Sequence, residues 1–256
     1  MTLTLIVSLT ALFADRLATR DPFDTYAGPA LSPPTWRNLL GTDNLGRDIY
    51  TDIVHGARTS MTVVLLVVCL SAAIGIGLGL LAGYRGGLLD DLIMRVGELF
   101  QVVPRFFLAL LMISYFGPGL DRLILLLGLT SWPFLTRVVR AETLRLKQRE
   151  FVEASRGVGA STLRIALRHL FPNLLPPVLV VIALFASRVI MIEAGLAFLG
   201  LSDPNRISLG YLANNAQPYL ATAWWMALFP GIAIVIAVLG LNLLGDALND
   251  SLEPRR

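Results

Sequence analysis

Long, uninterrupted apolar runs dominate the pattern of hydrophobic and polar positions along this chain. A helix needs about 20 mostly apolar residues to cross a membrane, and residues 61–83 form such a run without one charged side chain. Four more apolar runs follow, at residues 102–119, 123–135, 174–201 and 223–244. The pattern predicts an all-α, polytopic membrane protein of about six transmembrane helices, counting one incomplete first span.

The opening apolar run, residues 3–14, is too short for a comfortable span. No basic stretch precedes it, which argues against a secretory signal. We expect it to be the end of a first span whose beginning is missing. Residues 1–60 are therefore expected to hold this truncated span and an external segment, and residues 61–256 the core of the protein.

Composition identifies lipid as the solvent of these runs. Hydrophobic residues make up 55% of the chain and charged residues only 15%, with a mean hydropathy of +0.69. A soluble domain carries roughly a quarter charged residues, and here the deficit is concentrated in the runs. The pI near 9.3 does not indicate nucleic-acid binding, because the basic residues lie between the runs and form no separate basic domain.

The basic residues between the runs predict the orientation. Residues 137–168 contain eight lysines and arginines, whereas residues 202–222 contain only Arg206. Because cytoplasmic loops carry an excess of Lys and Arg, we expect the first segment in the cytoplasm and the second outside. With six spans, both termini of the full-length chain are then cytoplasmic, in agreement with the basic C-terminal pair Arg255-Arg256.

Small residues recur at every fourth position within the run at 61–83, namely Ser71, Gly75, Gly79 and Gly83. Residues four apart lie on one face of a helix. In lipid, small side chains on such a face let a second helix approach closely. The sequence therefore predicts tight packing of another helix along this face.

The segment at 137–172 is too long and too structured to be a simple connector. Its first part is rich in helix formers, and Gly157 and Gly159 then break the helix. Ser161 is a candidate cap for a second, short helix, which Pro172 is expected to end. The pattern predicts a helix, a glycine turn and a short helix.

The short helix is predicted to be amphipathic, with Arg164 and Arg168 on a basic face. Its apolar face is expected to consist of Leu163, Ala166, Leu167, Leu170 and Phe171. Such a helix is suited to docking into a groove on a partner. The alternative is an amphipathic hairpin at the membrane interface that has no partner.

These residues resemble a known motif, the "EAA…G…I-x-L-P" loop of ABC-importer permeases. Glu153, Ala154, Gly159 and Pro172 match it in type and spacing, whereas Ser155, His169 and Phe171 depart mildly from it. In that family the loop docks on the nucleotide-binding subunit and couples ATP-driven closure to pore opening. The resemblance implies this ATPase-coupling role for Glu153, Ala154, Ser155, Gly159, Arg164, Arg168 and Pro172. For Glu153 taken alone, an ordinary solvated side chain is the alternative.

A second match precedes the run at 61–83. The residues Gly41, Thr42, Asp43, Gly46, Arg47 and Asp48 are similar to the "GTDxLGRD" signature of the shorter permease in the dipeptide/oligopeptide/nickel branch. Further similar stretches extend the resemblance over roughly residues 41–256. Three roles compete for this external signature: a gate, a contact with a delivery protein, and structural capping by Asp43. The apolar side formed by Ile49, Ile53 and Val54 suggests a short interfacial helix.

The resemblance implies a type I ABC-importer permease fold, with a coupling loop at 137–172. It implies that the chain forms half of a pore, by alternating access, for peptides or a related small solute. The implied partners are a homologous second permease subunit, two ATP-binding subunits, an external substrate-binding protein and membrane lipid, with no nucleic acid. The implied location is the cell (plasma or inner) membrane. No cofactor is expected on this chain, with ATP and Mg on the partner subunits.

Three charged residues lie within or near the apolar runs and are candidates for pore lining or gating: Arg105, Arg188 and Glu193. A charge at the bilayer centre costs about 2.5–3.5 kcal/mol, so such residues usually face a cavity or a partner. Arg188 and Glu193 are five residues apart, roughly 140° around a helix, and are not expected to pair. For Glu193 the roles are structure or gating. For Arg105, which follows Pro104, they are the translocation path or snorkelling to the interface.

Other function classes are disfavoured by what the sequence lacks. It contains no G-x-x-x-x-G-K-[ST] phosphate loop, no catalytic set of side chains, and no ligand constellation around His55, His169 or Cys69. We therefore expect no enzyme and no metal site. The rival hypothesis is an ATP-independent channel or secondary transporter, which would function from this chain alone.

Overall fold

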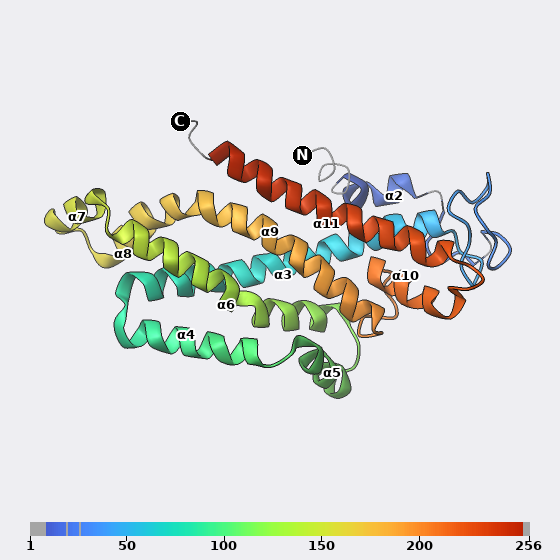
Figure 1. Cartoon of the computed structure of the whole chain (residues 1–256), viewed down its shortest axis with the longest axis horizontal. Coiled ribbons are helices and arrows are strands. Elements are labelled where there is room, and N and C mark those ends of the chain that lie inside the picture. The colour runs from blue at the N-terminus through green and yellow to red at the C-terminus, as the bar shows by residue number, and fades with distance from the viewer. Residues whose placement is uncertain (1–8, 19, 26, 253–256) are drawn as a thin grey trace.

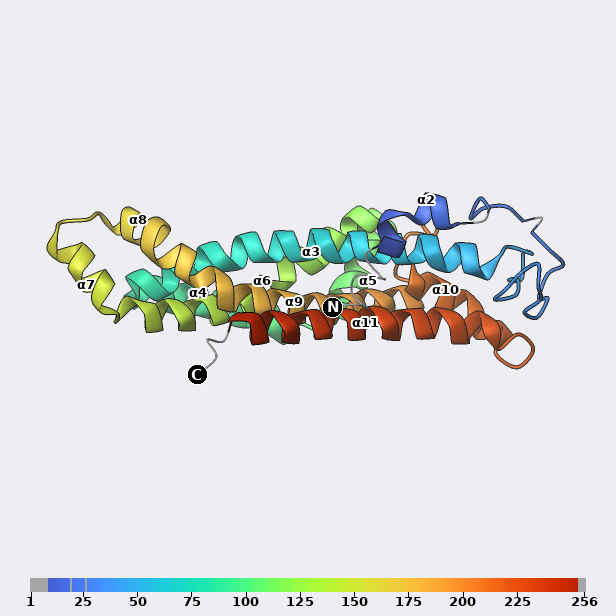
Figure 2. The same cartoon turned by 90° about the horizontal axis from the view of Figure 1, so that it is seen from above.

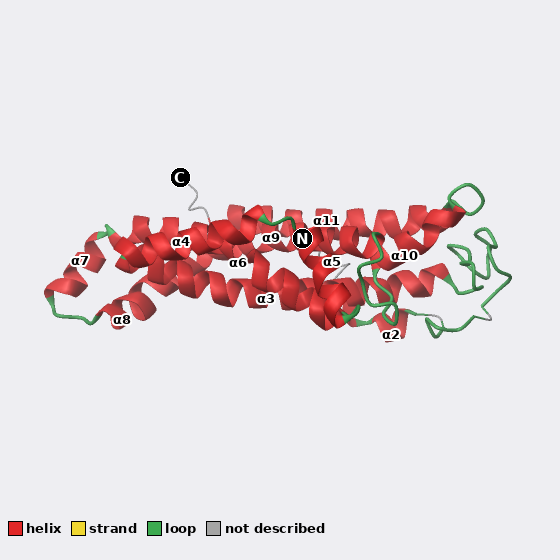
Figure 3. Ribbon diagram, turned by 90° about the horizontal axis from the view of Figure 1, so that it is seen from below, coloured by secondary structure: helices red, strands yellow, loops and turns green. Residues whose placement is uncertain are grey.

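The computed structural model describes residues 9–18, 20–25 and 27–252, which contain helices but no named strand. The long helices run along one axis, with short elements and loops at both ends (Figures 1, 2 and 3). The helical elements are α2 (Ala14–Leu17), α3 (Ile49–Arg85), α4 (Gly87–Val102), α5 (Arg105–Phe116), α6 (Leu120–Lys147), α7 (Glu150–Gly157), α8 (Thr162–Arg164), the π-helical turn η1 (Ile165–Leu170), α9 (Phe171–Phe198), α10 (Leu209–Ala216), the 3₁₀ turn η2 (Gln217–Tyr219) and α11 (Trp225–Leu252). The all-α prediction is confirmed.

Four helical segments of the described chain are long and apolar enough to cross a membrane: Ile49–Arg85, Leu120–Lys147, Thr162–Phe198 and Trp225–Ser251. A fifth span arises if the bent pair α4 and α5 is counted as one. The predicted first span at residues 3–14 lies mostly outside the described residues. The multi-pass architecture therefore agrees with the sequence pattern for the part of the chain that the structure describes.

The predicted span at 102–119 is wrong, because the helix in this run has only 12 residues and is too short to cross a membrane alone. The chain bends there by 78° between α4 and α5. Pro104 is the cause, because a residue before proline is driven away from helical backbone angles, and Val103 is extended with φ −80° and ψ 120°. The apolar run therefore supplies only α5, and α4 begins at Gly87, well before the predicted start.

The predicted short interfacial helix before residue 61 is not a separate element. Ile49, Ile53 and Val54 belong to the first turns of α3, which continues without a break to Arg85. No proline interrupts this stretch, and Gly56 allows the backbone of α10 to approach, since a Cβ there would lie 3.3 Å from the amide nitrogen of Leu209. The N-terminal part of α3 is thus held by α10 and extends the span.

The predicted close packing along the small-residue face of α3 is confirmed, and the partner is α6. A Cβ added at Gly75 would lie 2.7 Å from the Cβ of Leu135, and one at Gly79 would lie 2.7 Å from the Cβ of Val139. Ser71 donates a hydrogen bond to the carbonyl oxygen of Gly128 at 3.0 Å. Small residues therefore bring the two helix backbones together, which is the main source of packing energy between helices in lipid.

The apolar core joins four long helices. Val63 and Val67 of α3, Leu135 of α6 and Ile190 of α9 are fully buried, and Ala237 and Leu241 of α11 close the cluster. By contrast, α5 and the outer face of α11 expose large apolar side chains, such as Phe107, Leu111, Val235 and Leu239. In Figure 1 the α4–α5 pair and α11 lie at opposite edges of the bundle. Two apolar faces are thus left for lipid or a partner.

Candidate functional site

The helix–turn–helix at one end of the bundle, residues 149–168, forms the α7–α8 hairpin (Figures 1 and 2). Val152 is fully buried and fixes α7 against the bundle, whereas Glu153 beside it is exposed. The turn depends on Gly159, whose φ of +76° favours glycine. Ser161 accepts a hydrogen bond from the amide of Arg164 at 3.4 Å and so starts α8. The predicted cap and the turn at Gly159 are confirmed, whereas Gly157 does not break the helix and belongs to α7.

The hairpin presents an apolar surface to its surroundings. The exposed fractions are 85% for Val158, 68% for Leu163 and 56% for Leu167. Arg164 and Arg168 are exposed as well, as are Glu153 and Ala154, and Glu153 makes no ion pair within the described residues. Isolated exposed apolar residues need no explanation, but a cluster rimmed by charges is typical of a docking surface.

The predicted apolar face of the short helix is partly wrong. Leu163 and Leu167 point outward, and the residues that pack inward are Ile165 and Leu170. The reason is the π-helical turn Ile165–Leu170, whose i→i+5 hydrogen bonds shift the angular phase of the helix. The sequence pattern assumed the α-helical period throughout.

Pro172 does not end this helix. The chain runs as one helical span from Thr162 to Phe198, with Pro172 at the second position of α9. A proline ring clashes with the carbonyl of residue i−4 in a regular α-helix, and the wider π turn directly before it relieves this constraint. The side-chain amide of Asn173 donates to the carbonyl oxygen of His169 at 2.7 Å and satisfies one backbone acceptor there.

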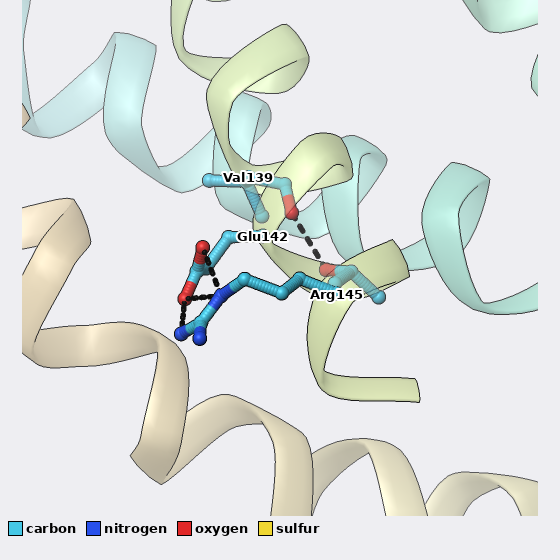
Figure 4. Close-up of polar contacts among 4 residues, drawn as sticks. Val139, Glu142 and Arg145 are labelled. Carbon is cyan, nitrogen blue, oxygen red and sulfur yellow. Dashed lines mark hydrogen bonds and ion pairs between the residues drawn. The ribbon is translucent and has the colours of Figure 1, made fainter. Parts of the chain in front are cut away.

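The hairpin is tied to the ends of α3 and α6. The Lys147 ammonium donates to the carbonyl oxygen of Tyr84 at 2.6 Å. The Tyr84 ring lies 5.6 Å from this ammonium and 5.7 Å from the guanidinium of Arg156 on α7. On the neighbouring turn of α6, Arg145 folds back onto Glu142 (Figure 4). Movement of α7 is therefore linked to the ends of two spans.

A bidentate ion pair holds α4 against α6. The Arg140 guanidinium donates to both carboxylate oxygens of Asp90, at 2.5 Å each. The side chain of Asp90 is only 10% exposed and that of Arg140 is 34% exposed. A bidentate guanidinium–carboxylate pair fixes orientation as well as distance, so this contact sets the position of α4.

Asp90→Asn is expected to lower the stability of the purified protein by about 1–3 kcal/mol, because it leaves the Arg140 guanidinium without its charged acceptor. Thermal unfolding in detergent measures the loss. The matched control is Asp91→Asn, which removes the same charge from the next, exposed position of α4. Equal melting temperatures for the two variants would contradict a positioning role for the pair.

The 41–48 loop lies at the opposite end of the bundle from the hairpin and folds upon itself. One Asp43 carboxylate oxygen accepts from the amides of Leu45 and Arg47, each at 2.8 Å. The Asp48 carboxylate accepts from the amide of Thr51 at 3.1 Å and from its hydroxyl at 2.8 Å. The cap of α3 is therefore Asp48, and Asp43 instead closes the loop, so helix capping, one of the three roles considered, does not apply to Asp43.

The rest of this signature attaches the loop to α11. The indole nitrogen of Trp225 donates to the carbonyl oxygen of Thr42 at 3.2 Å. Gly41 has a φ of +83°, and a Cβ there would lie 2.8 Å from the Trp225 ring. Gly46 also has a positive φ, and the Nε atom of Arg47 lies 3.4 Å from a carboxylate oxygen of Asp43. Thr42, Asp43 and Asp48 of the signature thus each have a hydrogen-bond partner within the protein.

Glu193 is buried at the junction of three helices. Its carboxylate accepts from the Ser60 hydroxyl of α3 at 3.0 Å, and the same hydroxyl accepts from the amide of Leu209, at the start of α10, at 3.2 Å. Arg188 lies elsewhere, with its guanidinium 5.0 Å from the centre of the Phe134 ring. The expectation that Arg188 and Glu193 do not pair is confirmed, and of the two roles considered for Glu193, these contacts support the structural one.

Arg105 and Arg188 line one cavity of about 360 Å³ between the α4–α5 bend, α6 and α9. Arg137 of α6 lines the same cavity and was not singled out from the sequence, where it counts only as the first basic residue of a loop. Helical spacing is the signal that could have identified it, because Thr130, Phe134 and Arg137 are spaced i, i+4 and i+7 and therefore share one helix face. The cavity has no acidic residue in its lining.

The predicted site residues thus fall into separate places: the α7–α8 hairpin, the 41–48 loop, the arginine cavity and the buried Glu193. Within the described residues, no group of three or more His, Cys, Asp or Glu side chains could hold a metal ion.

Comparison with known proteins finds one family and several relatives, all of which are components of transport systems. The family described as "Binding-protein-dependent transport system inner membrane component" matches residues 75–256. The chain is 38% identical to the "Di/tripeptide transport system permease protein DppC" of Pseudomonas aeruginosa, over 98% of this chain and 85% of that protein. It is 35% identical to the "Dipeptide transport system permease protein DppC" of Haemophilus influenzae, over 98% and 88% of the two chains.

A solved structure supports the fold. The inward-facing MetNI methionine ABC transporter contains a chain that aligns with a TM-score of 0.67 at 22% identity, over 79% of this chain and 97% of that one. At this identity the similarity concerns the fold alone. The predicted type I importer permease fold is confirmed.

Proposed function

Because this chain belongs to the family of binding-protein-dependent transport system inner membrane components and is a permease of the ABC-importer type, we propose that it forms half of the pore that imports peptides or a related small solute. The peptide class is supported by relatives that are named as dipeptide and di/tripeptide transport permeases. Multiple apolar helices agree with a multi-pass protein of the inner membrane.

The observation that carries the proposal is the α7–α8 hairpin. Its apolar residues Val158 and Leu163 are exposed, the first in the turn after α7 and the second in α8. Its Arg156 contacts the ring of Tyr84 at the end of α3, and the carbonyl oxygen of Tyr84 accepts a hydrogen bond from Lys147 at the end of α6. A surface that is open to a partner on one side and linked to two spans on the other is suited to transmitting a partner's movement to the membrane.

The proposed partners follow from the surfaces left open. Two ATP-binding subunits dock at the hairpins of this chain and of a homologous second permease, and carry ATP and Mg. The second permease and lipid cover the apolar faces of α5 and α11, and an external binding protein delivers the solute. The hairpin lies in the cytoplasm, as the basic residues from Arg140 to Arg168 favour, and both termini of the full-length chain are cytoplasmic.

In the proposed mechanism, this chain contributes movement and a path but no hydrolysis. ATP binding closes the two ATP-binding subunits, and the hairpin passes that movement to α6 and α9. The spans then open outward to accept the solute, and hydrolysis resets them. A rival function, an ATP-independent channel or secondary transporter, would leave the hairpin dispensable.

The test is purification of the tagged chain from its native membrane in mild detergent. We expect a second permease and ATP-binding subunits to co-purify and to hydrolyse ATP. Leu163→Glu is expected to reduce the recovered ATP-binding subunits at least about tenfold, because it places a charge in the apolar docking surface. Gln148→Glu is the control, since it adds the same charge to an exposed residue at the same end of the bundle.

A different outcome would revive the rival. If the chain is recovered alone under conditions that preserve known complexes, and transports solute without ATP, it is a channel or secondary transporter. If Leu163→Glu and the control recover the same amount of ATP-binding subunits, the hairpin is not the docking surface.

A further inference from the structure

The arginine cavity has a marked positive charge. Arg105 of α5, Arg137 of α6 and Arg188 of α9 all line it, together with Gln101 at the end of α4. Within the part of the chain that the structure describes, none of the three arginines forms an ion pair. The guanidinium of Arg188 lies 5.0 Å from the centre of the Phe134 ring. Three like charges thus converge without compensation.

The cavity lies at the level of the middle of the membrane. Phe134 and Arg137 flank the positions of α6 that pack against Gly75 and Gly79, since Leu135 contacts the first glycine and Val139 the second. Those glycines lie in the second half of the uncharged run at 61–83, away from both of its ends. The cavity is therefore well away from the headgroup layer, which lies outside a hydrocarbon core of about 30 Å.

This position decides what the cavity can face. An unpaired arginine at the bilayer centre costs about 2.5–3.5 kcal/mol on insertion scales, and Arg137 and Arg188 are both exposed on the isolated chain. Arginines in such positions face a water-filled path or an anion. A lipid phosphate would sit at the membrane surface, so the position favours an anion that travels through the protein.

We propose that the arginine cavity is a transient subsite for the carboxylate group of the solute that this permease transports. The proposal rests on the proposed import function and adds the chemical class of its substrate. Guanidinium groups bind carboxylates with paired, directional hydrogen bonds. Phe100, Phe134 and Phe185 supply apolar walls beside the charges, which suits a small organic acid such as a short peptide with a free C-terminus.

The size and the charge of the cavity both fit such a solute. About 360 Å³ is at the lower end of the range for small-molecule pockets. A cavity of this size can hold the carboxylate of the solute with part of a side chain. It does not enclose the whole solute, and a solute that passes along a path must not be held too tightly. Concentrated positive charge in a low-dielectric wall also raises the local concentration of anions.

The test measures the electrostatic potential in the cavity of the assembled transporter. Gln101→Cys in a Cys69→Ser background places one thiol at the cavity. This thiol is modified with two thiosulfonate reagents, one that carries an anionic sulfonate group and one that carries a cationic trimethylammonium group. Each modification rate is divided by the rate of the same reagent with free cysteine, and the two ratios are compared. The control thiol is Thr62→Cys, in an outer cavity lined by Arg58, Arg206, Asp121 and Asp203.

We expect the anionic reagent to be favoured by about tenfold or more at position 101 and not at position 62. Arg188→Gln combined with Arg105→Gln should remove most of this preference, and Arg188→Lys should retain it. Trialanine with a free carboxylate should protect the thiol at position 101, and trialanine amide should not. Co-purified ATP-binding subunits and ATP hydrolysis in the same sample report the import function separately.

Two results would overturn the proposal while the importer stays intact. Equal preference at the two thiols would mean that another subunit neutralises the arginines. A preference that changes with the phosphatidylglycerol content of the bilayer, and is insensitive to trialanine, would assign the arginines to a lipid phosphate.

Discussion

Gly159→Pro is expected to reduce solute uptake by the assembled transporter by roughly a hundredfold while the protein still inserts into the membrane. The φ of Gly159 is +76°, and proline fixes φ near −65°. The substitution also removes an amide that donates to the carbonyl oxygen of Arg156 at 2.9 Å. A conformational cost of about 3 kcal/mol in the turn would depopulate the docking form of the hairpin about a hundredfold.

This substitution should not alter the packing of the helix bundle. No atom lies within 4 Å of a Cβ added at Gly159, so the effect is confined to the turn. Uptake and ATP hydrolysis in reconstituted vesicles measure it, and membrane insertion is followed by the yield of purified protein. Uptake at the wild-type rate would mean that the turn does not couple the ATP-binding subunits to the pore.

Two variants separate backbone shape from side-chain bulk. Gly159→Asn should keep much of the transport activity, because asparagine tolerates a positive φ better than other non-glycine residues. Gly157→Ala should be close to wild type, since Gly157 lies on α7 with ordinary backbone angles and no atom within 4 Å of an added Cβ. Equal losses in all three variants would indicate a general sensitivity of the hairpin instead.

Gly79→Val is expected to have the largest effect on folding, with little folded protein left in the membrane. A Cβ at position 79 would lie 2.7 Å from both the carbonyl oxygen of Thr136 and the Cβ of Val139. Valine would push α6 away from α3 along their whole contact. Overpacking of one site costs about 1–3 kcal/mol, and loss of the close approach removes packing that apolar burial cannot replace in lipid.

Gly77→Val is the matched control, because it makes the same change two residues earlier on the same helix. No atom lies within 4 Å of a Cβ at Gly77, so this variant should accumulate and melt like the wild type. The amount of protein extracted in mild detergent and its melting temperature measure both variants. Normal accumulation of Gly79→Val would show that α3 and α6 do not depend on close approach.

Predictions from the sequence succeeded where one local property is sufficient. The uncharged run at 61–83 could only be a span, and the fourfold spacing from Ser71 to Gly83 could only form one helix face. The turn at Gly159 and the cap at Ser161 also follow from local backbone preferences. Residues of the hairpin that the family resemblance identified are exposed at one end of the bundle, as a docking surface requires.

Predictions failed where the phase or the continuity of a helix depended on its surroundings. Pro104 breaks a helix, whereas Pro172 lies inside one because a π turn precedes it. The sequence presents both as a proline within an apolar stretch. That same π turn places Leu170 on the buried side, away from the exposed Leu163 and Leu167, which no fixed helical period can predict.

The sequence by itself determined that this chain is an all-α membrane protein with a glycine turn in its 137–172 segment, because hydrophobicity, helix period and glycine turns act over a few neighbouring residues. Only the tertiary structure decided that Asp90 pairs with Arg140 and that Glu193 is buried beside Ser60. It also decided that Arg105, Arg137 and Arg188 meet in one cavity. These residues come from different helices, so their proximity depends on how the helices pack.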